Sequence, residues 1–183
     1  MKRYRVSKET DFYYSTCTIT AWLPVFQDEC YFNAIIESLK YCQQHKGLYL
    51  IGYVIMPTHL HLVTSNSEHT TLSAIMRDFR HYTSSTVRDL LEADQQHRFL
   101  KIFQKAAINL PRQKYKIWKD DYHPVALTSD EWFFQKMDYL HQNPVRKGFV
   151  EFAERWKYSS ARNWEQGDNR IIRLDKDVFF SED

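Results

Sequence analysis

The sequence predicts an α+β fold, a ferredoxin-like antiparallel sheet with helices on one face. Three observations support this class. The segments follow one another as strand, helix, strand, strand, helix, short strand and helix. Two of the strand-like segments, 48–56 and 59–65, adjoin around Pro57, as in a hairpin. The helix-like segments carry apolar residues three and four positions apart, which favours helices that cover a sheet.

The first strand and the first helix are predicted from composition and from boundary residues. Residues 12–26 are rich in aromatic and β-branched types, which is typical of a strand. Asp28 can cap the helix that follows, because its side chain accepts hydrogen bonds from the free amides of a first turn. Gly47 suits the end of that helix, since glycine readily adopts the left-handed conformation found there. The predicted hairpin of 48–56 and 59–65 comes next.

In the second half of the chain some segments have a clear pattern and others have none. Apolar residues at helical spacing predict an amphipathic helix at roughly 71–92. Residues 93–116 show no clear period, so we expect irregular structure there. A short strand is predicted within 117–127, before the last helix.

The last helix has both ends marked in the sequence. Thr128 and Glu131 have the spacing of a capping box, which predicts the start. Pro144 should end the helix, because the residue before a proline avoids helical backbone angles. Its apolar stripe consists of Phe133, Met137 and Leu140.

Length and composition bound the class of protein. The 183 residues are 43% hydrophobic and 26% charged, which fits one globular domain. We predict a single domain over 1–165 and a polar C-terminal tail over 166–183. Three cysteines without a CxxC pair favour reduced thiols. No apolar run is long enough to span a bilayer and no Gly-rich phosphate loop occurs, so we expect a cytoplasmic protein without a membrane or nucleotide partner.

The sharpest local signal is the pair His59 and His61. Residues two apart on a strand point to the same face, so both imidazoles project together while Leu60 and Leu62 face the core. Two neutral imidazoles make half of a metal site. A pair of surface histidines without a ligand is the plainer interpretation of a bare HxH.

The last helix offers partners for this pair. Tyr139 and Asn143 are four residues apart and share one helix face. The Tyr139 hydroxyl could reach a cleft, and the amide oxygen of Asn143 could complete a metal shell. Alternatively, Tyr139 is a tyrosine at the edge of the core and Asn143 a helix-end residue before proline.

Positive charge gathers in one stretch. Between residues 98 and 119 seven basic residues occur without an acidic one, and Phe103, Tyr115 and Trp118 are interleaved. Basic side chains that follow phosphates and rings that stack on bases suit single-stranded nucleic acid. A solvated loop explains the charge equally well. The candidates for DNA contact are Arg112, Lys114, Lys116 and Lys119, with Arg146 and Lys147 or Lys2, Arg3 and Arg5 as another path.

Four segments together carry a family resemblance: YVIMPTHLHLV (53–63), YKIWKDDYHPVAL (115–127), DYLHQNPVRKGFV (138–150) and WKYSSARNW (156–164). In this order they resemble the REP-associated tyrosine transposases, a branch of the single-tyrosine HUH transposases. The resemblance covers roughly residues 12–165 and implies the HUH nuclease fold.

The resemblance also implies roles for individual residues. His59 and His61 match the histidines that hold a divalent cation, Mg²⁺ or Mn²⁺. Tyr139 matches the nucleophile that attacks a phosphorus atom of single-stranded DNA. Asn143 stands where the wider superfamily carries a glutamine ligand, and the neighbours Gln142 or His141 could substitute for it. Thr58 replaces the Asn often found before the first histidine.

The function that this resemblance implies is a metal-dependent DNA endonuclease and strand transferase. It would cleave near palindromic DNA hairpins through a 5′-phosphotyrosine, as a nucleoid-associated monomer or homodimer. A hairpin-binding protein that its host keeps without catalysis is one alternative. A small metal hydrolase unrelated to DNA is another, although it leaves Tyr139 and the basic stretch unexplained.

Overall fold

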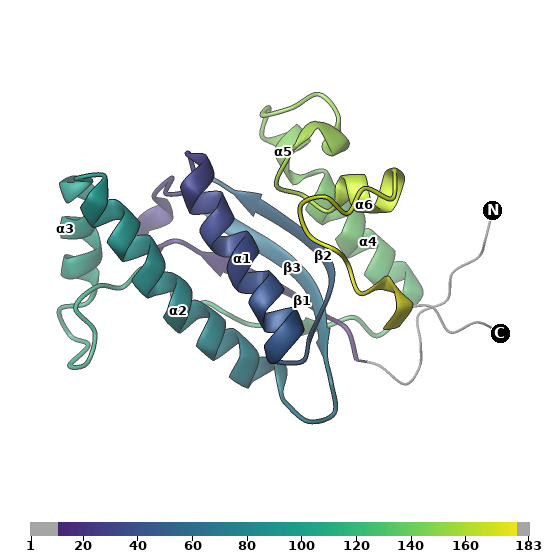
Figure 1. Cartoon of the computed structure of the whole chain (residues 1–183), viewed down its shortest axis with the longest axis horizontal. Helices are drawn as coiled ribbons and strands as arrows, with labels where there is room; N and C mark the ends of the chain where they lie inside the picture. The colour runs from purple at the N-terminus through teal and green to yellow at the C-terminus, as the bar shows by residue number, and fades with distance from the viewer. Residues whose placement is uncertain (1–10, 179–183) are drawn as a thin grey trace.

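The computed structural model describes residues 11–178, which form a twisted four-stranded antiparallel sheet flanked by helices (Figure 1). The strand order is β2-β3-β1-β4, so the predicted α+β class with an antiparallel sheet is confirmed. The elements are β1 (Tyr13–Thr18), the 3-10 helix η1 (Thr20–Trp22), α1 (Glu29–His45), β2 (Leu48–Met56), β3 (His59–Asn66), α2 (Leu72–Ala93), α3 (His97–Ala106), β4 (Val125–Ala126), α4 (Asp130–His141), α5 (Asn143–Arg146), η2 (Ala153–Arg155), α6 (Ala161–Glu165) and η3 (Lys176–Val178).

The β2–β3 hairpin is present as predicted, and it fixes the position of the histidine pair. Met56 pairs with His59 next to the turn, and β1 pairs along the other side of β3, with Thr16 opposite His61. The strand predicted over 12–26 ends earlier, at Thr18. The chain leaves the sheet there because the following turn places Ala21 at φ 58°.

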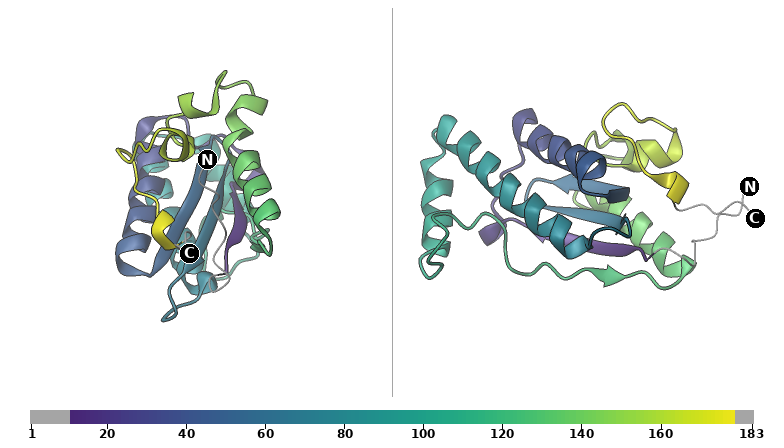
Figure 2. Two further views of the ribbon diagram at one scale, coloured as in Figure 1. Left: turned by 90° about the vertical axis from the view of Figure 1, so that its right-hand side faces the viewer. Right: turned by 60° about the horizontal axis from the view of Figure 1, so that its bottom comes forward.

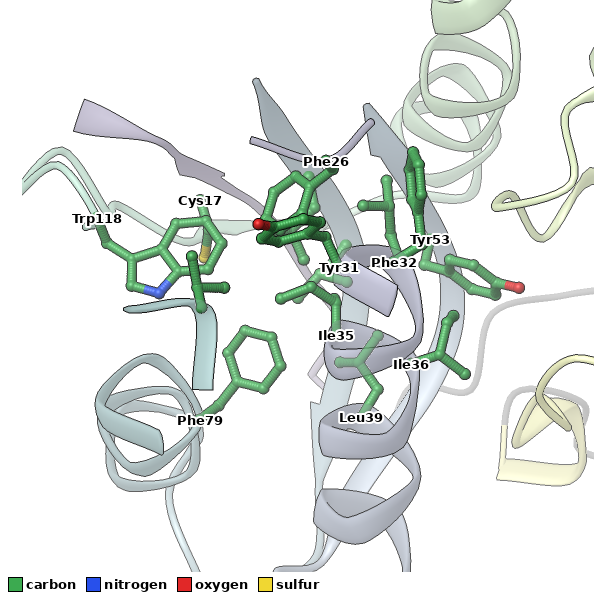
Figure 3. Packing of buried hydrophobic residues seen from close by; sticks show 14 of the residues in the cluster. Cys17, Phe26, Tyr31, Phe32, Ile35, Ile36, Leu39, Tyr53, Phe79 and Trp118 are labelled. Atoms are coloured by element: carbon green, nitrogen blue, oxygen red, sulfur yellow. The ribbon is translucent and has the colours of Figure 1, made fainter. Parts of the chain in front are cut away.

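The sheet is covered on both faces, as the side view in Figure 2 shows. Helices α1 and α2 lie on one face of the sheet, which is the arrangement that the sequence predicted for its helices. There Leu60 and Leu62 join a large core whose aromatic part includes Phe26, Phe32 and Phe79 (Figure 3). The sequence did not predict that α4 covers the opposite face.

A smaller apolar cluster fixes α4 to that opposite face. Phe133, Met137 and Leu140 of the predicted stripe pack against β2 and β3 residues, including Val54 and Val63. His59 and His61 point to this side of the sheet, because they alternate with Leu60 and Leu62, which face the α1–α2 side. The same helix therefore brings Tyr139 to the histidines.

Two predicted boundaries around the last helix were wrong. Ser129, not Thr128, caps α4, since the Ser129 side chain accepts a bond from the Trp132 amide. The helix ends at His141, and Asn143 begins α5 instead of extending α4. Pro144 lies in the first turn of α5, where a missing amide hydrogen costs nothing.

The stretch predicted to be irregular, 93–116, contains α3. Leu100 and Phe103 of this helix are buried in the large core. The ten-residue helix was missed because only a short apolar stripe marks it, between polar residues at both ends. Within the described residues no helix is long and apolar enough to cross a membrane.

Two segments bond to the β2 edge of the sheet: residues 158–160 pair with Tyr53 and Ile55, and the segment after α6 reaches Leu50. Asp175 accepts a hydrogen bond from the Leu50 amide and donates its own amide to the Leu50 carbonyl. Ile172 and Leu174 are buried in the large core. Residues 166–178 of the predicted polar tail thus contribute apolar side chains to the core, while the domain boundary near residue 165 stays a prediction.

Candidate active site

His59 and His61 converge on the face of the sheet that α4 covers. Their ring centroids lie 4.7 Å apart at 70°. The two residues are 8% and 6% exposed. The prediction that both imidazoles share one face is therefore confirmed, and the pair is far less exposed than two surface histidines would be.

Hydroxyl groups hold the Nδ1 atoms of both rings. The Thr58 hydroxyl lies 2.8 Å from Nδ1 of His59. The Tyr14 and Thr16 hydroxyls lie 2.7 and 2.8 Å from Nδ1 of His61. A hydrogen-bonded Nδ1 orients the imidazole and leaves Nε2 as the atom that can ligate a metal.

Burial keeps both histidines neutral. Loss of hydration, and to a smaller extent the charge of Lys147, lowers the pKa of His59 to about 4. The pKa of His61 falls to about 3 through burial first and then through His59, Lys136 and Arg146. Neutral imidazole is the form that binds a cation, so the rings need not lose a proton to do so.

Asn143 lies on the same imidazole. Its Nδ2 is 3.1 Å from Nε2 of His61, and the residue is 5% exposed. Its Oδ1 is buried and has no hydrogen-bond partner among the residues that the structure describes. A half-turn of the amide would exchange the two atoms and place the oxygen beside Nε2. An unpartnered buried oxygen next to an imidazole nitrogen fits a cation site.

The donor set suits a hard cation only in part. Over residues 11–178 there is no group of three or more His, Cys, Asp and Glu side chains that could hold a metal. Two imidazoles and one amide oxygen leave positions to be filled by water or by phosphate oxygens. Mg²⁺ and Mn²⁺ tolerate such mixed shells, because they keep several oxygen ligands from outside the protein.

Tyr139 stands at the open side of this group. Its ring centroid is 5.6 Å from that of His61 and 6.3 Å from that of Tyr14. The residue is 40% exposed. The hairpin and α4 thus bring Tyr139 to His59 and His61, and α5 adds Asn143, which the sequence spacing had placed on the same helix as Tyr139.

Other candidates from the sequence lie elsewhere. Nε2 of His141 is bound to the Ser160 hydroxyl at 2.8 Å, away from the histidine pair. Gln142 makes only backbone contacts among those observed, at the junction of α4 and α5. Tyr82, another tyrosine with an exposed ring, belongs to α2 on the opposite face of the sheet.

The predicted DNA contacts fall into two groups. Arg146 and Lys147 lie beside the site: the Arg146 guanidinium is 4.3 Å from the Tyr139 ring centroid, and Lys147 acts on His59. Lys119 reaches the site through Trp22, as described below. Lys116 pairs with Asp120, and the Lys114 ammonium lies over the Tyr115 ring.

No observed contact joins Arg112, Lys114 or Lys116 to the histidines or to Tyr139 in residues 11–178. The second possible path, through Lys2, Arg3 and Arg5, lies outside the described residues.

Sequence analysis missed the residues that surround the histidines. Tyr14 and Thr16 lie two residues apart on β1. The Lys136 ammonium lies 5.1 Å from the Tyr14 ring centroid. Alternation predicts that Tyr14 and Thr16 share a face, but the register of β1 against β3 decides that this face meets His61. Thr58, which stands where the family often has Asn, contacts His59 directly.

The candidate site is thus a sheet that presents paired histidines to a tyrosine on a covering helix. Residues 17–129 match the family described as "Transposase IS200 like", and the chain belongs to this family.

The chain is also similar to one known sequence and to one solved fold. A protein of Haemophilus influenzae described as "Putative REP-associated tyrosine transposase" is 26% identical over 133 residues, which cover 71% of this chain and 68% of that protein. The fold also matches a solved structure described as a "REP associates tyrosine transposase bound to a REP hairpin". That match has a TM-score of 0.56 and 16% identity, over 100% of this chain and 93% of the other.

Proposed function

We propose that this protein is a metal-dependent single-stranded DNA endonuclease and strand transferase that works through a 5′-phosphotyrosine. The observation that carries the proposal is the approach of Tyr139 to His61, with a ring-centroid distance of 5.6 Å, where Asn143 contacts the same imidazole. A protein that only binds DNA has no need for a tyrosine, two neutral imidazoles and an amide in one place.

His59, His61 and Asn143 are the residues that would hold Mg²⁺ or Mn²⁺. When bound, the cation would polarise the scissile phosphate and neutralise charge that develops on it. The protein's own part is to keep the imidazoles neutral and oriented, through burial and the hydroxyls of Tyr14 and Thr58.

Tyr139 would act as the nucleophile. Its phenolic oxygen forms a bond to phosphorus, the bond from phosphorus to the 3′-oxygen breaks, and the DNA leaves with a 3′-hydroxyl after a proton has passed from the phenol to solvent and from solvent to the leaving oxygen. The 5′-phosphate stays on Tyr139 and keeps the bond energy. Attack by another 3′-hydroxyl reverses the step and joins a new strand, so no nucleotide cofactor is required.

Hairpin-bearing DNA is the substrate class we propose. The proposal is supported by the relative and by the structural neighbour, whose descriptions name a REP-associated transposase and a REP hairpin. The Lys136 ammonium and the Arg146 guanidinium lie 5.8 and 4.3 Å from the Tyr139 ring centroid, and the charge of Lys147 acts on His59. Such charge suits a phosphate backbone that passes over the tyrosine.

The experiment is a search for a covalent protein–DNA band. The full chain is incubated with a labelled strand that carries a hairpin and single-stranded flanks, with Mg²⁺, with Mn²⁺ or with a chelator, and the products are separated under denaturing conditions. We expect an adduct in both metals and none with the chelator. Tight hairpin binding without an adduct in any metal would instead favour the non-catalytic binding protein.

A further inference from the structure

Trp22 is an exposed indole held in a strained backbone conformation beside the histidine pair. Trp22 is 54% exposed, whereas most tryptophans are largely buried. Its φ is 55°, and the preceding Ala21 has φ 58°. Residues other than glycine rarely adopt this left-handed backbone conformation. Such strain persists only where the surrounding structure enforces it.

The surroundings do enforce it. The Ile19 amide donates to the Thr58 carbonyl in the β2–β3 turn, at 2.9 Å. Ile19 also forms a β-bridge with Trp118, and the Trp22 amide donates back to the Ile19 carbonyl at 2.9 Å. The turn that carries Trp22 is thus tied both to the hairpin that bears the histidines and to the 117–119 segment.

The indole touches both a proposed metal ligand and a cation. Its ring centroid lies 5.8 Å from that of His59 in an edge-to-face arrangement. The Lys119 ammonium lies 5.2 Å from the ring centroid and also pairs with Asp121 at 2.9 Å. An exposed ring and an ammonium next to a phosphate-cleaving centre are the two parts of a nucleotide-binding surface.

We propose that Trp22 is a stacking platform for a DNA base next to the cleaved phosphate, with Lys119 contacting the neighbouring backbone phosphate. This inference rests on the proposed function and adds a base-binding position on the His59 side of the site, whereas Tyr139 lies on the His61 side. Stacking on an indole accepts any base, so Trp22 positions the strand without reading its sequence.

The experiment measures binding, not cleavage. A single strand of about twelve thymidines and an abasic strand of the same length are titrated into the full chain with Mg²⁺ present. The wild-type protein should bind the thymidine strand more tightly than the abasic strand. Trp22→Ala should lose roughly tenfold in affinity for thymidine and little for the abasic strand, because only the stacking contact is removed. Trp22→Tyr should restore part of the difference.

The tryptophan fluorescence gives a second readout. Thymine stacked on Trp22 should quench emission in the wild type and in Trp132→Phe, but not in Trp22→Phe. Tyr41→Ala, which removes an equally exposed ring from α1 on the other face of the sheet, is the matched control and should bind both strands normally.

The inference is overturned if folded Trp22→Ala still distinguishes thymidine from abasic DNA as the wild type does. It is also overturned if the quenching depends on Trp132. In either case a wild-type protein that still forms the covalent adduct with hairpin DNA would leave the proposed function standing. A wild type that neither binds the thymidine strand nor forms the adduct would refute both.

Discussion

The guanidinium of Arg146 lies 4.3 Å from the centroid of the Tyr139 ring and donates to the Tyr139 carbonyl at 2.5 Å. The two residues belong to different helices, α5 and α4. The helices are separated at Gln142, and the change of direction there places the Arg146 guanidinium over the Tyr139 ring. The contact restrains a half-exposed ring and puts positive charge where a phosphate would arrive.

Tyr139→Phe should bind hairpin DNA with unchanged affinity and form no covalent adduct. The substitution removes one oxygen and keeps the ring that Arg146 and His61 contact. Binding is followed by gel shift and the adduct by denaturing electrophoresis. Tyr82→Phe, on the opposite face of the sheet, is the control and should form the adduct normally. Cleavage by the Tyr139 variant would assign the reaction to another tyrosine.

Asn143→Leu should weaken Mn²⁺ binding at least tenfold, whereas Asn143→Asp should keep it. Leucine has a similar volume and no oxygen, while aspartate keeps an oxygen ligand and adds a charge. Titration calorimetry with Mn²⁺ and the protein alone measures the difference. Equal affinities for leucine and wild type would mean that the third ligand comes from Gln142 or from outside the chain.

Lys147→Ala should flatten the salt dependence of binding to single-stranded DNA by about 0.7 in log–log slope, the value for one lost phosphate contact. The side chain is exposed and acts electrostatically on His59, so it faces the expected path of the backbone. Lys114→Ala and Lys116→Ala test the path predicted from the basic stretch. If these two change the slope and Lys147→Ala does not, the DNA follows that stretch instead.

Thiol reactivity should separate the three cysteines. Cys30 is exposed, whereas Cys17 and Cys42 are buried. Burial raises the pKa of Cys17 to about 12 and that of Cys42 to about 11. A thiol reagent at about pH 8 should modify only Cys30 in the native protein, because the other two are shielded and protonated, and thiolate is the reactive form.

The same shifts predict a loss of stability in alkali. The unfolded chain releases its thiol protons near pH 9, before the folded protein does, so unfolding is favoured as pH rises above that value. The free energy of unfolding should fall by up to about 1.4 kcal/mol per pH unit for Cys17 between about pH 9 and about pH 12. Urea titrations of wild type and Cys17→Ala test this, and parallel pH profiles would contradict it.

Gly52→Ala should destabilise the attachment of α4. A Cβ at this position would lie 2.7 Å from both Sδ and Cε of Met137. Overpacking of this kind costs about 1–3 kcal/mol, at the lower end here because a methionine end is flexible. Urea unfolding measures the cost, and in Gly52→Ala with Met137→Ala the combined loss should be smaller than the sum of the two single losses.

The sequence predicted what depends on local periodicity. Strand alternation was enough to predict that His59 and His61 share a face. The apolar stripe that begins at Phe133 was enough to predict the helix α4, which carries Tyr139. The residues that hold the rings were out of reach, because Tyr14 contacts His61 only through the register between β1 and β3. The family resemblance, and not periodicity, suggested the roles proposed for His59, His61 and Tyr139.

Errors arose where one residue decides the geometry. The first strand ends at Thr18 because Ala21 and Trp22 turn the chain with positive φ. Neither residue is a glycine, so the sequence carries no signal for this turn. Asn143 was expected on the same helix as Tyr139, and it reaches the site from a separate short helix instead. In both cases tertiary hydrogen bonds outweigh the local preference of the sequence.

The closure of the β2 edge by Asp175 has a consequence for self-association. The opposite edge, β4, is only two residues long, so within residues 11–178 neither border of the sheet offers a long row of free backbone groups to a second molecule. A chain shortened at residue 165, at the boundary that composition suggests, would lose Asp175 and uncover apolar surface beneath Ile172 and Leu174. We expect such a chain to aggregate through strand addition at the part of β2 around Leu50, because residues 158–160 still cover Tyr53 and Ile55. The longer chain should stay dispersed, so residues 166–178 protect the protein against fibrous assembly.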